Sequence, residues 1–401
     1  MSVIRKLHIR HFKSIWDDTI ELGRLNVFIG TNGAGKSNIL EAIAMASASI
    51  DGGIDYPKLH QRGARLSAPD IFRSSFKNKG RNQTFSIGIE MDDVKYNMSI
   101  RSKNEFSYFT EIIKTKHDVD IAGRGPAGAK IGDFKLPFLD KTKSIVPFAM
   151  SARSGKVSGL ADLSKYAIYL PSTPILRGSS EDSSRLNPLG LYGGRLAGAL
   201  NDIMVEIDNK EQSQDLRRFF ILLNWFKSFG PRHGIDALLK ANDQLLPDDI
   251  IVQYTDKYMR TDFNKLSAYD VSEGALYILF VLVLLIHNKT PNIFALDNID
   301  SALNPGLVTN LINHIADIVE RDKGKQILMT THNPTTLDAL DLFNDEHRLF
   351  VVERKADGQT KTTRISPPEG MTKEMWEEAY YGMKLSDIWL SGAIGGLPKG
   401  L

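Results

Sequence analysis

One stretch constrains this chain of 401 residues more than any other. Residues 30–37 read Gly-Thr-Asn-Gly-Ala-Gly-Lys-Ser and fill every specified position of the phosphate-loop pattern G-x-x-x-x-G-K-[ST]. The apolar residues 25–29 predict a short buried strand before the loop, and the apolar spacing of 38–45 predicts a helix after it. This order predicts a site for a nucleoside triphosphate, because backbone N–H groups and the helix N-terminus then face phosphate oxygens.

The loop also predicts individual roles. Lys36 would reach the β- and γ-phosphates, and the hydroxyl group of Ser37 would ligate Mg²⁺, so the expected cofactors are ATP and Mg²⁺. The backbone around the phosphates would come from Gly30, Asn32, Gly33, Gly35 and Asn38. The alternative is a glycine-rich turn before an ordinary helix, which the complete motif and its context disfavour.

The overall charge limits where a nucleic acid could bind. The formal net charge is only +2, so such a role would need a local patch of cations. The best candidate lies between residues 62 and 81 and consists of Arg62, Arg65, Arg73, Lys77, Lys79 and Arg81. The alternative is a solvated surface without a ligand, because lysine and arginine usually decorate exposed faces.

Three further observations bear on the compartment. The chain contains no cysteine, which excludes disulfides and thiolate metal sites. Its longest apolar run, residues 275–286, is too short to cross a bilayer and suits a buried helix. The first ten residues lack the apolar core of a signal peptide. We therefore expect a cytoplasmic protein with no membrane partner.

The middle of the chain predicts a change from strands to helices. Strands are expected over 84–90, 94–100 and 106–113, joined by short connectors as an antiparallel meander. The glycine-rich residues 122–129 show no periodicity and are interpreted as a mobile loop. After a junction rich in Pro, Ser and Gly at 171–194, helices are expected over 196–207 and 214–229, the second with Leu222, Leu223, Trp225 and Phe226 facing inward.

The last third carries a second set of motifs. Residues 268–274 end in Ser272-Glu273-Gly274 and lead into the apolar helix, where a serine is either part of an anion site or a simple helix cap. The strand 292–297 ends at Asp297, which fits the Walker B pattern of a carboxylate that holds Mg²⁺ through water. The alternative is that Asp297 merely caps the next turn. A third strand delivers His332 to a turn.

Four motifs in this order resemble the RecF/SMC/OLD branch of ABC-type ATPases, over residues 3–50 and 268–354. The opening strand pair, with Phe-Lys-Ser at 12–14, is similar to this branch and unlike transporter ATPases. The resemblance implies an α/β fold, namely an ABC-type P-loop NTPase head with an antiparallel β-subdomain and a helical insertion. The sequence has no heptads for a long coiled coil. The expected division is an N-terminal lobe over 1–150, a helical insertion over 151–265 and a C-terminal lobe over 266–401.

The resemblance also assigns roles across two copies of the chain. In this family, the signature that Ser272 and Gly274 match contacts the γ-phosphate held by another subunit. One loop and one signature in each chain therefore imply a head-to-tail dimer around two nucleotides. The residue matching His332 would sense the γ-phosphate.

One residue departs from the family pattern. ABC ATPases place glutamate directly after the Walker B aspartate, where it polarises the attacking water, but this chain has Asn298. An amide cannot accept the proton, and general-base help is typically worth about 10²- to 10⁴-fold in rate. We therefore expect slow turnover, with Asp300 as the substitute that positions water.

The resemblance is strongest to stand-alone bacterial ATPases without coils, such as those of the Septu and PARIS anti-phage systems. It implies an ATP-gated sensor or scaffold that regulates a separate effector protein, a nuclease or toxin. The alternative is a RecF-like clamp on DNA, and a transporter motor is a weaker third reading. The aromatic, glycine-rich residues 385–396 would dock either on the head or on a partner.

Overall fold

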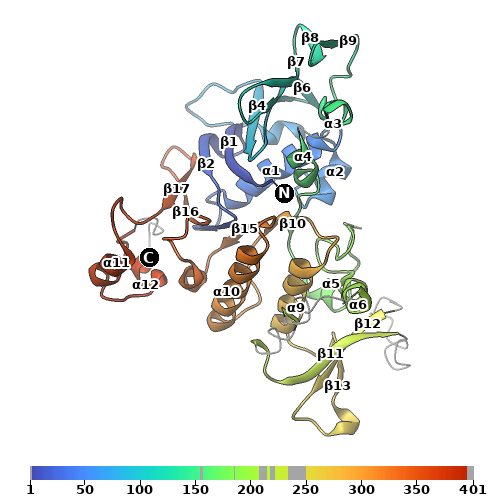
Figure 1. The fold of residues 1–401 in the computed structure, drawn as a ribbon, viewed down its shortest axis with the longest axis vertical. Helices are drawn as coiled ribbons and strands as arrows, with labels where there is room; N and C mark the ends of the chain where they lie inside the picture. The colour runs from blue at the N-terminus through green and yellow to red at the C-terminus, as the bar shows by residue number, and fades with distance from the viewer. Residues whose placement is uncertain are drawn as a thin grey trace. The chain divides into compact units, whose positions relative to one another are not determined.

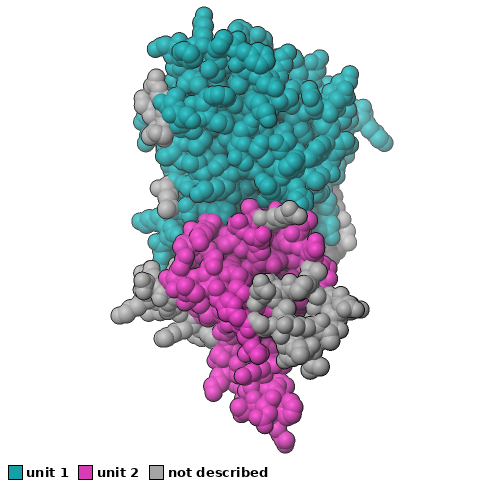
Figure 2. All heavy atoms as spheres, turned by 90° about the vertical axis from the view of Figure 1, so that its right-hand side faces the viewer, with its two compact units in different colours: residues 1–168, 291–300, 316–401 teal, residues 169–290, 301–315 magenta. Residues whose placement is uncertain are grey.

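A computed structural model describes residues 2–153, 157–184, 186–206, 215–216, 222–233 and 250–394. The chain divides into two compact units, coloured separately in Figure 2. The first unit takes residues 1–168, 291–300 and 316–401, and the second takes 169–290 and 301–315. None of the helices within the described ranges is long and apolar enough to span a membrane.

The first unit contains an antiparallel sheet of eight strands in the order β2-β1-β4-β5-β6-β7-β8-β9 (Figure 1). Its strands are β1 (Ile4–Phe12), β2 (Ile15–Glu21), β4 (Thr84–Met91), β5 (Val94–Ser102), β6 (Phe106–Thr115), β7 (Asp120–Gly125), β8 (Gly128–Ile131) and β9 (Phe134–Leu136). Inward and outward residues alternate along β5, as expected for a sheet with one buried face. The predicted strand pair and the predicted meander are confirmed.

The predicted mobile loop over 122–129 is wrong. These residues belong to a hairpin in which Ala122 pairs with Ile131 and Gly125 with Gly128. Glycine and alanine give no apolar alternation, so the sequence carried no strand signal here. The ladder forms through backbone N–H and C=O groups, which every residue except proline supplies.

The second sheet of this unit has the order β10-β14-β15-β3-β16-β17. Its strands are β10 (Ile168–Tyr169), β14 (Ile293–Leu296), β15 (Gln326–Thr331), β3 (Leu25–Ile29), β16 (His347–Arg354) and β17 (Thr360–Ile365). The four strands from β14 to β16 run parallel, and β17 closes the edge antiparallel. Every residue of β14, β15 and β3 is buried, as expected for parallel strands covered on both faces.

Helix α1 (Lys36–Ile50) contacts both sheets, through β1 and β4 on one side and β15 on the other. This position explains why nearly all of its residues are buried and why its apolar face is not confined to one stripe. The remaining helical segments of the unit are α2 (Tyr56–Gln61), η1 (Pro69–Phe72), α3 (Val146–Arg153), α4 (Ser158–Leu163), η4 (Pro334–Ala339), α11 (Lys373–Ala379) and α12 (Leu385–Leu390).

The C-terminal segment packs on its own unit. Helix α12 contacts η4, where the backbone N–H of Ser386 donates to Asp338 Oδ1 at 2.9 Å and Trp389 is buried. Of the two predicted alternatives, residues 385–390 therefore dock on the head. Residues 395 and 396 of the predicted stretch lie outside the described residues.

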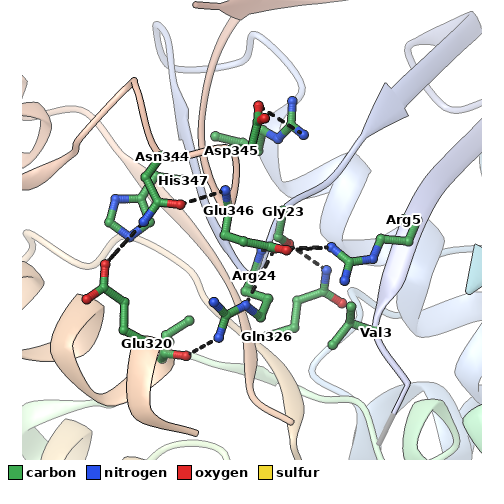
Figure 3. A network of polar contacts seen from close by, with 12 residues as sticks. Val3, Arg5, Gly23, Arg24, Glu320, Gln326, Asn344, Asp345, Glu346 and His347 are labelled. Carbon is green, nitrogen blue, oxygen red and sulfur yellow. Dashed lines mark hydrogen bonds and ion pairs between the residues drawn. The ribbon is translucent and has the colours of Figure 1, made fainter. Parts of the chain in front are cut away.

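A polar network ties the two sheets of the first unit together at the start of their strands (Figure 3). The buried side chain of Gln326 donates to the carbonyl oxygens of Ile4 and Gly23, each at 2.7 Å. Glu346 accepts from the Arg5 guanidinium at 3.0 Å and from the Arg24 backbone at 3.0 Å. These bonds fix β1 to β15 and β16, at the strand ends opposite the phosphate loop.

The second unit contains α5 (Thr173–Leu176), α6 (Leu196–Glu206), α9 (Glu273–Ile286) and part of α10 (Pro305–Arg321), which continues into the first unit at Ala316. It also holds a three-stranded antiparallel sheet of β11 (Phe226–His233), β12 (Ile250–Asp256) and β13 (Lys265–Ser267), with η3 (Thr261–Phe263) before the last strand. The predicted helices 196–207 and 275–286 correspond to α6 and α9.

The predicted helix over 214–229 is wrong from Phe226 onward, where β11 begins. The register of β11 against β12 shifts between Phe226 and Ser228. The extra residue allows Phe226 and Phe229, three apart, both to be buried, with their rings 5.6 and 6.3 Å from that of Tyr254. Because of this bulge, the buried residues Phe226 and Phe229 have the three-residue spacing that is typical of a helix. Residues 214 and 217–221 of this prediction lie outside the described residues.

Candidate functional site

The loop that follows β3 has the backbone shape of an anion site. Gly35, at the N-cap of α1, has φ +111°, and a Cβ atom there would lie 2.3 Å from Thr360 Oγ1. A Cβ on Gly30 would lie 2.1 Å from the carbonyl oxygen of Val352, so both positions require glycine. No described side chain caps α1, and its first turn contains no acidic residue. The N–H groups at this helix end are therefore directed at the pocket beyond the loop.

Lys36 lies under the loop and is only 5% exposed. Its Nζ donates to the carbonyl oxygens of Gly30 at 2.8 Å and Thr31 at 3.1 Å. Burial lowers the pKa of Lys36 to about 8, although the negative charges of Asp297 and Asp300 act in the opposite direction. A further anion in the pocket would stabilise the charged ammonium.

Ser37 and Asp297 come together, as the sequence predicted. Ser37 Oγ donates to Asp297 Oδ2 at 3.0 Å, and Thr330 Oγ1 donates to Asp297 Oδ1. Asp297 follows β14, and Thr330 lies on the neighbouring β15, so the parallel pairing of these strands sets the geometry. A hydroxyl and a carboxylate are oxygen ligands of the kind that Mg²⁺ prefers.

These two residues would hold only part of a Mg²⁺ coordination shell. Among the described residues there is no group of three or more His, Cys, Asp or Glu side chains placed to hold a metal. Phosphate oxygens and water would complete the shell, which is the usual arrangement for Mg²⁺ at a nucleotide. The donor set therefore fits Mg²⁺ bound together with a phosphate.

Asn298, in the position of the family's glutamate, has an unusual backbone conformation. Its φ is +55°, in the left-handed region that asparagine tolerates better than glutamate does. Its backbone N–H donates to Thr330 Oγ1 at 2.9 Å. The asparagine thus fits the local turn.

Asp300 lies beside the same turn. Its Oδ2 accepts from the backbone N–H of His332 at 3.4 Å, and its Oδ1 is buried with no hydrogen-bond partner among the described residues. A buried carboxylate oxygen without a donor is costly, so it favours a bound water or a metal-bound water at this point.

His332 contacts the loop lysine. His332 Nδ1 lies 3.3 Å from Lys36 Nζ. Burial and the positive charge of Lys36 lower the pKa of His332 below its usual 6.5, so the ring is neutral near pH 7. This contact is a hydrogen bond in the tautomer that carries its proton on Nε2, because Lys36 can only donate. The ring also forms a hydrogen bond with the backbone of Gly30.

The pocket in front of the loop has a volume of about 330 Å³. Three cations line it, and among the described residues that do so none is a carboxylate. The lining residues are Asn32, Gly33, Gly35, Lys36, Ser37, Asn38, Arg65, Asn298, His332 and Arg354. A pocket with this charge and these donors selects a polyanion.

Two of these cations were not predicted as nucleotide ligands. Arg65 is held by Glu41 Oε1 at 2.6 Å and by Asn38 Oδ1 at 2.6 Å, and Lys13 also pairs with Glu41. Burial opposes the ionised form of Glu41, but the hydrogen bond from Arg65 and the charge of Lys13 outweigh it and lower its pKa. Arg354 lies at the end of β16. Neither arginine belongs to a motif, so only the tertiary structure reveals them.

The serine and glycine of the predicted signature lie in the second unit. Ser272 Oγ accepts from the backbone N–H of Ala275 at 3.4 Å and caps α9. A Cβ on Gly274 would lie 3.1 Å from the carbonyl oxygen of Ala302, so this turn is closely packed. The helix-cap role of Ser272 is thus observed, and its contact with a second subunit stays a prediction.

Only part of the predicted basic patch is paired with carboxylates. Arg62 is buried and pairs with Asp51 at 3.0 Å, and Arg73 pairs with Asp70. Arg81 lies 3.6 Å from the same Asp70 carboxylate, and Lys79 lies over the Trp16 ring at 4.5 Å from its centre. Arg62 and Arg73 therefore stabilise the fold locally, whereas Lys77, Lys79 and Arg81 are exposed.

Known proteins share this architecture. The crystal structure of an SmcHead bound to the C-winged helix domain of ScpA aligns with a TM-score of 0.56 at 15% identity, over 92% of this chain and 99% of that one. The Smc head domain with an extended coiled coil, bound to the C-terminal domain of ScpA and derived from Pyrococcus furiosus, aligns at 0.53 and 16% identity, over 95% and 100%. The fold is therefore an α/β fold of the SMC-head type.

The curated sequence relative aligns with a smaller part of the chain than the solved structures do. The DNA replication and repair protein RecF of Leptospira biflexa is 28% identical over 136 residues, which span 30% of this chain and 35% of RecF. The chain thus matches about a third of the length of this curated relative. The pattern of one family, described as "AAA domain, putative AbiEii toxin, Type IV TA system", matches residues 25–338. From the phosphate loop through His332, the chain belongs to this family of AAA-domain ATPases.

Proposed function

We propose that this chain binds ATP with Mg²⁺ and hydrolyses it slowly. The observation that carries the proposal is the pocket of about 330 Å³ at the N-terminus of α1, lined by Lys36, Arg65 and Arg354 and bordered by the Ser37–Asp297 pair. Lys36 would bind the β- and γ-phosphates, Ser37 and Asp297 would hold Mg²⁺, and His332 would donate Nε2–H to the γ-phosphate. When bound, Mg²⁺ would supply neutralisation of the developing phosphate charge.

The direct test is calorimetric titration with ATP and Mg²⁺. The wild-type chain should bind, and Lys36→Ala should lower the affinity by about 100-fold or more, because it removes a desolvated charge that faces the phosphates. Lys325→Ala, a buried lysine in the same unit outside the pocket, is the matched control and should bind as wild type. Equal affinity of wild type and Lys36→Ala would contradict the proposal.

Slow turnover follows from the residues after Asp297. Asn298 cannot act as a general base, and Oδ1 of Asp300 is a buried carboxylate oxygen without a donor among the described residues. We assign Asp300 the role of positioning the attacking water. A steady-state rate of several turnovers per second in the wild-type chain would contradict this assignment.

We further propose that ATP joins two copies head to tail, with Ser272 and Gly274 of one copy completing the pocket of the other. The support is that one chain carries one loop and one signature. Mass measurement in solution with ATP and Mg²⁺, on wild type and on Ser272→Arg, tests this. The wild type should dimerise and the variant should stay monomeric while still binding ATP. A wild-type chain that binds ATP and remains monomeric would contradict the dimer.

For the biological role, we propose a sensor or scaffold that regulates a separate effector in an anti-phage defence system. The support is the family description, which names a toxin–antitoxin system. The paired cations of the 62–81 segment weigh against the alternative of a RecF-like clamp on DNA, which the RecF similarity supports. Retention on duplex DNA that requires ATP and disappears at raised salt would favour the clamp. Co-purification with the product of a neighbouring gene would favour the effector.

A further inference from the structure

Arg354 lines the phosphate pocket and follows the loop's flank opposite His332. The register of the parallel sheet places its strand there, because Ile29 pairs with Thr331 on β15 and with Val351 on β16. The residues that flank Gly30 are therefore His332 on one side and Val352 on the other. Strand β16 continues to Arg354, two residues further, which lines the pocket with Asn32 and Gly33.

Arg354 is free to bind an anion. Within the described part of the chain its one side-chain hydrogen bond is from Nε to the carbonyl oxygen of Gly358 at 2.9 Å, and its side chain forms no ion pair there. Arg65, by contrast, is bound to a carboxylate. The Nη groups of Arg354 thus keep their donors, in a pocket whose described lining contains no acidic side chain.

The turn that holds Arg354 is fixed in place. Its ends are closed by a bond from the N–H of Lys355 to the carbonyl of Gln359 at 2.8 Å. Gly358, with φ +84°, lies against the Phe76 ring, where a Cβ would be 3.6 Å from a ring carbon. Thr360 Oγ1 then donates to the carbonyl of Ala34 at 2.7 Å. The turn is thereby joined to the phosphate loop, so the backbone that carries Arg354 is fixed beside the loop before any ligand binds.

We infer that Arg354 is a binding residue for the part of the nucleotide that does not react. Asp297, Asp300 and His332 all lie on the β14–β15 side of the loop, where Mg²⁺ and the γ-phosphate are proposed to bind. Arg354 lies on the β16 side and contacts phosphate oxygens that ATP and ADP share. This inference rests on the proposed nucleotide binding, and it predicts that Arg354 contributes to affinity and not to the rate of the bound complex.

The test compares Arg354→Ala, Arg354→Lys and wild type by titration with ATP and with ADP, followed by kcat measurement at saturating ATP. Arg354→Ala should raise Kd for both nucleotides by about tenfold and leave kcat unchanged. Arg354→Lys should recover only part of the affinity, because an ammonium lacks the fork of donors. The control is Arg364→Ala on β17, whose exposed pair with Asp345 lies outside the pocket lining and should change nothing.

Two results would overturn the inference while leaving nucleotide binding intact. One is an Arg354→Ala chain with wild-type Kd for both nucleotides. The other is a loss confined to ATP, or accompanied by a fall in kcat, which would place Arg354 at the γ-phosphate. A wild-type chain that binds neither nucleotide would instead refute the proposed function itself.

Gly358→Ala tests whether the turn positions Arg354. This variant should raise the Kd for ATP and for ADP, but by less than Arg354→Ala does. An unchanged Kd would show that the turn does not position the guanidinium.

Discussion

The two flanks of the phosphate loop are built from different chemistry. On the β15 side, carboxylates, an amide and an imidazole surround the end of the loop: Asp297, Asn298, Asp300 and His332. On the β16 side, the loop is supported by hydroxyl groups and a guanidinium, through Thr360, Ser14 and Arg354. The acidic and imidazole side chains are thus separated from the hydroxyl groups that support the loop and from the guanidinium of Arg354. Strand β3 divides the site into a reacting flank and a binding flank.

The strongest test of this division is Asp297→Asn on the reacting flank. The substitution keeps the shape but removes the charge that would hold Mg²⁺, so hydrolysis should fall by about 100-fold or more. The affinity for ATP measured without Mg²⁺ should stay the same or rise slightly, because a negative charge near the phosphates is gone. Hydrolysis at the wild-type rate would show that the metal is held elsewhere.

The protonation of Lys36 gives a second test. Its pKa of about 8 in the free chain means that the ammonium is charged below pH 8 and loses its proton above it. Phosphate binding requires the charged form, so Kd for ATP should be nearly constant from pH 6.5 to 7.5. It should then rise toward about tenfold per unit above pH 8. Lys36→Arg keeps its charge and should show no such rise. A flat profile for wild type up to pH 9.5 would contradict the prediction.

The variant Asn298→Glu tests whether the absence of a general base on the reacting flank is what limits kcat. If it does, kcat should rise by about tenfold, less than the full value of a general base, because glutamate at φ +55° is strained. The strain should also lower the free energy of unfolding by about 1 kcal/mol, which a urea titration would measure. Asn298→Gly relieves the strain without adding a base and should leave kcat at the wild-type value. A faster Asn298→Gly chain would mean that backbone shape, not the missing carboxylate, limits turnover.

The smallest expected effect comes from Thr360→Val on the binding flank. The hydroxyl bonds to the carbonyl of Ala34 and to Ser14 Oγ at 2.6 Å would be lost, which costs about 1–2 kcal/mol in the free energy of unfolding. The loop should bind ATP about threefold more weakly because it is less fixed, while kcat stays constant. Thr363→Val, three residues along the same strand and outside the pocket lining, is the control. A change in kcat would break the separation of the two flanks.

Sequence motifs mark more residues of the reacting flank than of the binding flank, for a physical reason. Lys36, Ser37, Asp297 and His332 each lie next to a strand end with a local pattern, and parallel strands bring such ends to one edge. Arg354 and Thr360 carry no local pattern. Their place depends on the antiparallel return of β17 and on contacts with residues more than 300 positions away, such as Ser14.

The two wrong predictions of secondary structure also have a non-local cause. The β7–β8 hairpin contains too many glycine and alanine residues to alternate, and β11 contains a bulge that spaces Phe226 and Phe229 like a helix. In both places strand pairing decided the structure, and pairing partners cannot be identified from a local window. The long apolar segments β3, β14, β15 and α9 had no such ambiguity.

The division of the chain into units has a mechanical consequence for Asp297. This residue belongs to a short segment of the first unit, 291–300, whose neighbours in sequence on both ends belong to the second. The strand that leads to Asp297, the proposed magnesium ligand, is therefore joined by covalent bonds at each end to the second unit. A force applied to the second unit would therefore be transmitted through these covalent connections to the segment 291–300, and it would change the position of Asp297.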